Sequence, residues 1–371
     1  MFRRIYTNWP VSVFVALLAL TIAYALSRTE RRPRHLGPSE AHRTITIDAG
    51  LTGAIGARPT FGESHVTAWA DTTGEGRPDA QIMKTCGPPT SQGIQWCYFN
   101  TVDTTPAAKH SLIVLLPGRG DNITHMMNTT FPQLQMIAWD LDAIVVGVPG
   151  KTSTSGDNSY NAGAECCWPP LDGPGPDDDT YIDAVVQKVI DAGWPVDPKK
   201  IYIIGHSAGA WMAFREACDH AGRYAAIFMM SGGGIRPGID AACAAGTFSA
   251  AHFHGTLDSA LYDNNIGDVI APNTVEYVSV EVDRVAPSRP ATSTQFATQN
   301  ACAGTLLTTT VNWLNFDADV PGPETTLLTW SGCPVGGTVE VWKGVGSMHI
   351  PNMTAAGEQA IVNFLSTHPK P

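Results

Sequence analysis

The sequence has few basic residues for its length. Lys and Arg together number 23 against 34 Asp and Glu, which gives a net charge of -11 at pH 7 over 371 residues. Six of the arginines lie within the first 40 residues, so the remainder of the chain is more acidic still. An acidic surface repels the phosphate backbone. We therefore expect no nucleic-acid partner.

The sequence also lacks the cysteine spacing of a metal site. It contains no C-x-x-C pair and no His/Cys cluster with zinc-site spacing, so no metal is expected. An even number of cysteines scattered through an exported chain favours disulfides, and the alternative is a set of buried free thiols in a cytosolic enzyme. The eight cysteines are Cys86, Cys97, Cys166, Cys167, Cys218, Cys243, Cys302 and Cys333.

The sequence has little apolar sequence of the length that a membrane-spanning helix needs. The run at 11–26 follows a segment with two arginines and ends near A-Y-A at 23–25, which fits a signal-peptidase site. It is short against the roughly 20 residues that a spanning helix needs. Residues 1–26 are therefore predicted to be a signal peptide or, if uncleaved, a membrane anchor. The protein is predicted to be secreted or extracytoplasmic.

An irregular Arg- and Pro-rich linker is predicted at 27–42, followed by one domain over 43–371. Residues 43–105 carry short strand-like pieces that suggest an antiparallel edge. From residue 110, short apolar runs alternate with helical segments, which predicts an α/β fold with a mostly parallel central sheet and helices on both faces. The residues at 260–335 interrupt this alternation and are expected to be an insertion near the active site. The predicted strands lie at 111–116, 143–148, 201–204, 225–230, 250–252 and 339–342, and the helices at 178–192, 208–220 and 355–367.

A G-x-S-x-G motif centred on Ser207 is the strongest functional signal. An apolar strand (IYII) leads into it and a helix (AGAWMAFREAC) leads out, which is the strand–turn–helix setting of a nucleophilic serine. The glycines at 205 and 209 allow strand and helix to approach closely around the turn. Ser207 is therefore predicted to be a nucleophile.

A serine nucleophile needs a base, and in this setting the order along the chain is Ser, Asp or Glu, His. Nine of the eleven histidines lie at or before residue 254, which leaves His349 and His368. His368 is in the terminal tail, whereas His349 follows the strand VEVW across a turn of small residues. His349 is therefore the predicted base.

The predicted acid is Asp258, which follows an apolar stretch and the turn H-G-T. A carboxylate at a strand end can accept the imidazole N–H and stabilise the imidazolium. Asp263 and Asp268 are competing candidates for the acid, and both lie in a segment that resembles a loop. His252 and His254 precede the acid and are expected to pack and hydrogen-bond locally.

Two backbone donors should form an oxyanion hole. The amide after the nucleophile, Ala208, is the first expected donor. The second is expected from the loop L-P-G-R-G-D after the first core strand, as Gly118 or Arg119, because Pro117 has no N–H. Trp168, in an irregular Pro-rich loop, is a candidate for a substrate wall. Trp211 and Trp342 lie within regular elements and are expected in the core.

With these residues in place, the chain from about residue 110 resembles the secreted esterases grouped with feruloyl esterases, acetylxylan esterases and polyhydroxybutyrate depolymerases. The segments that carry the likeness are VLLPGRGDN, VDPKKIYIIGHSAGAWMAFREAC, HGTLD, NAC…WSGC and GVGSMHIPN. The resemblance implies Ser207, Asp258 and His349 as a triad, an extracellular location and no cofactor. It also implies pairing of Cys218 with Cys243 and of Cys302 with Cys333.

This chain departs from that family at two places. The family usually has His-Gly in the oxyanion loop, where this chain has Pro117-Gly118, and commonly Gly-Gly-His at the base, where this chain has Ser347-Met348-His349. The expected function is a serine carboxylic-ester hydrolase acting on plant cell-wall esters or on polyhydroxyalkanoate-type polyester. The alternatives are a serine peptidase of the same fold and a non-catalytic, hydrolase-like binding protein.

Overall fold

The computed structural model describes residues 65–69, 80–83, 109–154, 156–163, 166–169, 172–191, 195–234, 241–258 and 292–371. The predicted leader, the predicted linker and the cysteines at 86 and 97 lie outside these ranges, as do the competing acids at 263 and 268.

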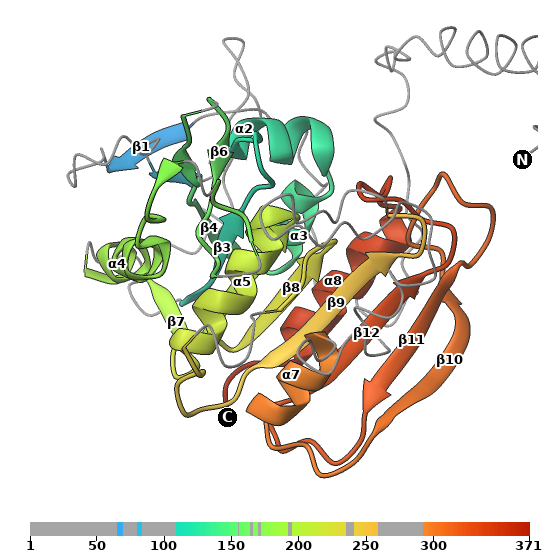
Figure 1. Ribbon diagram of the computed structural model, residues 1–371. Coiled ribbons are helices and arrows are strands. Elements are labelled where there is room, and N and C mark those ends of the chain that lie inside the picture. The colour runs from blue at the N-terminus through green and yellow to red at the C-terminus, as the bar shows by residue number, and fades with distance from the viewer. Residues whose placement is uncertain are drawn as a thin grey trace, which may run out of the picture. The chain divides into compact units, whose positions relative to one another are not determined.

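Within the described residues, the chain forms a ten-stranded sheet in the order β1-β2-β4-β3-β7-β8-β9-β12-β11-β10 (Figure 1). The central strands, from β4 to β12, pair in parallel, and two antiparallel strands extend each edge. The predicted α/β class with a mostly parallel sheet is confirmed. The strands of this sheet are β1 (His65–Trp69), β2 (Ala80–Met83), β3 (His110–Leu116), β4 (Ala143–Gly147), β7 (Val196–His206), β8 (Ala226–Met230), β9 (Ser249–Gly255), β10 (Leu306–Leu314), β11 (Thr325–Trp330) and β12 (Val339–Gly344). 

Helices cover both faces of the sheet, α5 and α4 on one and α8 on the other (Figure 1). A small hairpin of β5 (Lys151–Thr152) and β6 (Asn158–Ser159) stands apart from the main sheet. The remaining elements are α2 (Ile123–His125), the π-helical turn η2 (Met126–Thr130), α3 (Leu134–Asp140), α4 (Asp178–Asp191), α5 (Ala208–Asp219), α7 (Thr292–Gln299) and α8 (Ala355–Thr367).

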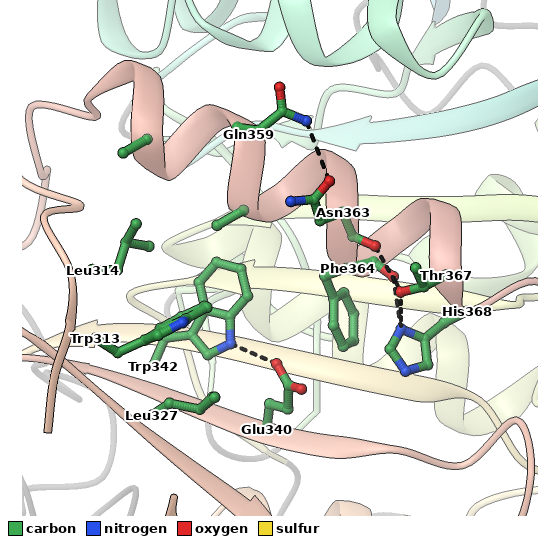
Figure 2. A pocket seen from close by; sticks show the side chains of 12 residues that line it. Trp313, Leu314, Leu327, Glu340, Trp342, Gln359, Asn363, Phe364, Thr367 and His368 are labelled. Atoms are coloured by element: carbon green, nitrogen blue, oxygen red, sulfur yellow. Dashed lines mark hydrogen bonds between the residues drawn. The ribbon is translucent and has the colours of Figure 1, made fainter. Parts of the chain in front are cut away.

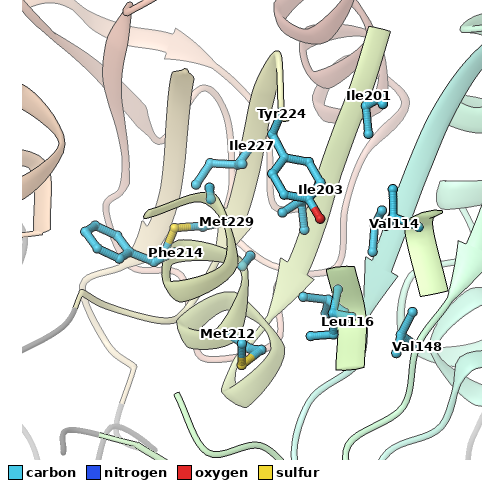
Figure 3. Close-up of a cluster of buried hydrophobic side chains, with 14 of the residues drawn as sticks. Val114, Leu116, Val148, Ile201, Ile203, Met212, Phe214, Tyr224, Ile227 and Met229 are labelled. Carbon is cyan, nitrogen blue, oxygen red and sulfur yellow. The ribbon is translucent and has the colours of Figure 1, made fainter. Parts of the chain in front are cut away.

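The two faces of the sheet carry separate apolar clusters because successive side chains of a strand point to opposite sides. All seven residues of β3 are buried. Leu112, Val114 and Leu116 belong to the cluster under α4 and α5, part of which Figure 3 shows. Ile113 and Leu115 belong to the cluster under α3 and α8. Burial on both faces is why β3 appears in the sequence as a continuous apolar run rather than an alternating one.

The segment predicted as an insertion, 260–335, is described from residue 292 onward. In its described part, α7 packs on the sheet through Phe296, and β10 and β11 continue the sheet beyond β12. Phe296 contacts Phe214 of α5 at 4.6 Å between ring centroids. This part of the segment therefore contributes to the core and to one edge of the sheet.

Among the residues that the structure describes, three cysteine pairs are bonded. Cys218, near the end of α5, joins Cys243, and Cys302, after α7, joins Cys333, after β11; both pairs are those that the family resemblance implies. The adjacent Cys166 and Cys167 form the third pair. The first two disulfides lie at the apolar cluster under α4 and α5: Cys218 belongs to it, and Cys243, Cys302 and Cys333 pack against it.

Peptide mapping of non-reduced protein tests these bonds. We expect the Cys218–Cys243 and Cys302–Cys333 linkages, each adding about 3 kcal/mol by restricting the unfolded chain. Reduction should accordingly lower the melting temperature. Recovery of all cysteines as free thiols from protein exported by its own leader would contradict this expectation.

Candidate active site

Ser207 lies on a tight turn between the end of β7 and the start of α5. Its φ of 53° and ψ of -120° are unusual for a residue with a side chain. Such strain persists only where the surroundings enforce it and is frequent at functional sites. A Cβ on Gly205 would collide with the Gly209 carbonyl, and one on Gly209 with the Leu116 carbonyl. The two glycines of the motif are therefore what lets strand, turn and helix approach so closely.

The structure brings the three predicted triad residues together. His349 Nε2 lies 2.9 Å from Ser207 Oγ, and His349 Nδ1 lies 2.7 Å from Asp258 Oδ2. Asp258 follows β9 and His349 follows β12, which are parallel neighbours in the sheet. Because parallel strands end at the same edge, residues far apart in the sequence meet there.

Burial makes the Asp258 carboxylate dependent on its partners. Its side chain is completely buried, whereas that of His349 is 19% exposed. A buried carboxylate is costly unless it is hydrogen-bonded. Asp258 Oδ2 also lies 3.1 Å from Nε2 of His254, whose side chain is nearly buried. With His349 donating through Nδ1, its Nε2 is free to accept the Ser207 hydroxyl proton.

His254 is a site residue whose role the sequence did not reveal. It was expected to hydrogen-bond locally, and its partner is the acid of the triad itself. The H-G-x-x-D spacing was visible, but only the turn after β9 shows that residues 254 and 258 face each other. A second donor on the same oxygen holds the carboxylate in place.

His206 is a second residue that sequence reasoning missed. Burial, followed by the nearby His349, lowers the pKa of His206 to about 3, so its ring is neutral. Its Nε2 lies 3.2 Å from the backbone carbonyl of His349 and donates to it. The ring also packs edge-on against Phe131 at 4.9 Å. His206 thus links the nucleophile turn to the loop of the base.

The predicted oxyanion loop lies directly beside the nucleophile. A Cβ on Gly118 would lie 3.3 Å from the Ser207 Cβ, so Gly118 is in close contact with the turn. Ala208 is the first residue of α5. The Arg119 side chain is exposed and pairs with Asp157 at 3.8 Å. The structure thus brings Gly118 and Ala208 to Ser207.

Trp168 is half-buried in the loop that contains the vicinal cysteine pair. The ammonium group of Lys151 lies 5.8 Å from the centre of its ring. A part in a substrate wall stays a prediction for this residue. Trp342, in contrast, is buried in the core as expected.

A hollow of about 500 Å³ lies between α8 and the strands β10, β11 and β12 (Figure 2). Trp313, Trp342 and Phe364 line its apolar part, and the triad residues are not among its lining residues. His368, the competing base, lines this hollow and its Nδ1 lies 2.7 Å from the Phe364 carbonyl. His368 is therefore held at the end of α8, not beside Ser207.

Comparison with known proteins finds an esterase family for part of the chain. Residues 102–269 match the model of a family described as putative esterase, and this segment contains Ser207 and Asp258. No curated protein matches the chain.

Among solved structures, an acetyl xylan esterase from Aspergillus awamori is 13% identical, with a TM-score of 0.49, over 81% of this chain and 98% of that one. Esterase PE8 is 17% identical, with a TM-score of 0.39, over 70% of this chain and 94% of that one. Residues 102–269, which match the family model, contain β7, the turn at Ser207 and the turn after β9 that carries Asp258. Residues 102–269 thus match an esterase family, and this match supports a carboxylic ester hydrolase on a mixed α/β fold with a mostly parallel sheet.

Proposed function

We propose that this esterase works through an acyl-enzyme on Ser207, with His349 as general base and Asp258 as the carboxylate that orients it. The observation that carries the proposal is the continuous line of short contacts from Asp258 Oδ2 to His349 Nδ1, and from His349 Nε2 to Ser207 Oγ. A non-catalytic binding protein has no need for this alignment of a buried acid, a base and a strained serine.

The first half of the reaction forms the acyl-enzyme. His349 Nε2 takes the Ser207 hydroxyl proton while Oγ bonds to the ester carbonyl carbon, whose oxygen becomes negative. Backbone N–H groups of Ala208 and of Gly118 or Arg119 stabilise that oxyanion. The bond to the alcohol oxygen then breaks, and His349 returns the proton to the departing alcohol. In the second half, water replaces Ser207 as nucleophile and releases the acid.

We propose that the natural substrates are plant cell-wall esters, carrying feruloyl or acetyl groups, or polyhydroxyalkanoate-type polyesters. This rests on the motifs that resemble the secreted esterases and on the acidic composition, which suits neutral polymers better than phosphate backbones. No cofactor takes part in the proposed reaction. Nucleic acid is not proposed as a partner.

Export by the segment at 1–26 is part of the proposal, with membrane association only if that segment is uncleaved. Within the residues that the structure describes, no helix is long and apolar enough to cross a bilayer.

A substrate panel tests the proposal. Hydrolysis of p-nitrophenyl acetate first establishes esterase turnover, and acetylated xylan, methyl ferulate and short polyhydroxybutyrate then compare acyl groups, with the Ser207→Ala variant as the matched control. We expect the wild type to release acid from at least one polymer-derived ester and the variant to release none. Cleavage of peptide amides with no ester turnover would contradict the proposal and support a serine peptidase.

His254 offers a prediction about how the acid is held. Replacing it by alanine removes one charge-assisted hydrogen bond to Asp258, worth about 1.5–3 kcal/mol, so kcat should fall about 10- to 100-fold. KM should change little because the His254 side chain is buried and contacts Asp258. His254→Gln, which restores an N–H donor, should recover part of the loss. An alanine variant with wild-type kcat, or one altered only in KM, would show that His254 does not position the acid.

A further inference from the structure

A second cluster of ionisable side chains lies between α4 and the end of α5. It consists of Asp179 in the first turn of α4, Glu216 in the last turn of α5, and His220 directly after that helix. The possible ligand atoms of these three residues all lie within 4.8 Å of one another. His220 Nε2 is 3.2 Å from Asp179 Oδ2. None of the three takes part in the proposed reaction.

The carboxyl group of Glu216 is buried, and contacts within the described fold satisfy only one of its two oxygens. Its side chain is fully buried, and its Oε1 accepts the Tyr224 hydroxyl at 2.5 Å. No donor among the described residues reaches Oε2, and Oδ1 of Asp179 is likewise buried without one. The Asp179 carboxyl lies within hydrogen-bonding reach of Glu216. The buried carboxyl group of Glu216 thus faces the half-buried one of Asp179, an arrangement that is costly unless a proton or a cation lies between them.

The nearby arginines do not neutralise this pair. Arg215 pairs with Asp219, and Arg223 pairs with Asp183 at 2.6 Å. Both arginines are thus paired with other carboxylates, and His220 lies 3.2 Å from Asp179 Oδ2, where a protonated ring would offset one of the two charges. A single divalent cation would balance the two carboxylates.

Glu216 and His220 share one face of the helix end because they are four residues apart. α4 brings Asp179 to the same place. The three side chains therefore converge on one place between the two helices.

We propose that Asp179, Glu216 and His220 bind a divalent transition-metal ion, for which Zn²⁺ is the best match. Imidazole suits zinc better than calcium or magnesium, and carboxylates complete a common zinc donor set. Ligands at about 2.0–2.1 Å in a tetrahedral site stand roughly 3.4 Å apart. The 3.2 Å between His220 Nε2 and Asp179 Oδ2 is close to that value. Water would supply the fourth ligand.

The ion would join α4 to α5, the helix that begins directly after Ser207. It would act as a structural clamp and would not touch the substrate. A cation that binds the folded chain and not the unfolded one raises the melting temperature. The sequence did not predict a metal because Asp179 lies far from the other two ligands along the chain.

The test uses the full chain, stripped with chelator and then titrated with Zn²⁺. Elemental analysis should find one zinc per chain, and calorimetry should give a Kd in the micromolar range or tighter. At zinc concentrations about 100 times Kd the melting temperature should rise by roughly 5 °C. The same titration with Ca²⁺ and Mg²⁺ should give no comparable binding.

Glu216→Gln, which keeps the shape of the side chain, and His220→Gln should each weaken zinc binding at least 100-fold. His125→Gln is the matched control, because His125 is an exposed histidine beside Asp121 and outside the cluster, and it should bind zinc as the wild type does. If either cluster variant fails to fold, X-ray absorption of the zinc-loaded wild type must show oxygen and nitrogen ligands with one imidazole. A wild type that binds no zinc, or cluster variants that bind it unchanged, would overturn the proposal.

Discussion

Replacing Ser207 by alanine is expected to lower kcat for ester hydrolysis by about 10⁴- to 10⁶-fold. The substitution removes only Oγ, the atom that lies 2.9 Å from His349 Nε2. Without it no acyl-enzyme can form, and the residual rate comes from the oxyanion donors and from substrate binding. Steady-state kinetics with p-nitrophenyl acetate measure the loss.

The fold should survive this change because alanine occupies the turn as serine does. A circular dichroism spectrum and a melting temperature close to those of the wild type are the control. A well-folded Ser207→Ala protein that keeps a substantial fraction of wild-type kcat would show that another residue is the nucleophile.

Replacing His349 by alanine should lower kcat by a similar factor, because residues of a catalytic triad act as a unit. His368→Ala is the matched control: its ring hydrogen-bonds at the end of α8, and its loss should leave kcat nearly unchanged.

Activity should also fall on acidification, since His349 must be neutral to accept the Ser207 proton. The two variants and the wild type are compared in one assay across pH.

Equal damage from the two histidine substitutions would contradict the assignment of the base. So would a wild-type rate that stays constant as the pH is lowered while the protein remains folded.

Much of the fold was predictable because the central strands are buried on both faces. The runs SLIVLL and AIVVGV became β3 and β4, and the segment after Ser207 became α5. The edge strands β10 and β11 were missed for the opposite reason. β10 (LLTTTVNWL) is exposed along most of its length and Thr-rich, so it shows neither an apolar run nor a clear alternation. Pairing with β11 is what defines it as a strand.

The three residues of the proposed triad could be chosen from the sequence because chain order leaves few candidates for the base and the acid, and the structure brings these three side chains into contact. The residues that support it could not. His254 contacts Asp258 through the turn after β9, and His206 contacts the His349 carbonyl in the loop after β12, and chain order shows neither contact. The cluster at Glu216 was hidden for a related reason, since its partner Asp179 comes from a different helix.

Covalent labelling tests the central claim most directly. A fluorophosphonate ester is incubated with the wild-type enzyme, activity is followed, and the modified peptide is identified by mass spectrometry. Our account predicts one adduct per chain on Ser207, complete loss of esterase activity in proportion to labelling, and no adduct in the Ser207→Ala variant. An adduct on a different residue that abolishes activity, or full esterase activity in a chain labelled at Ser207, would contradict it.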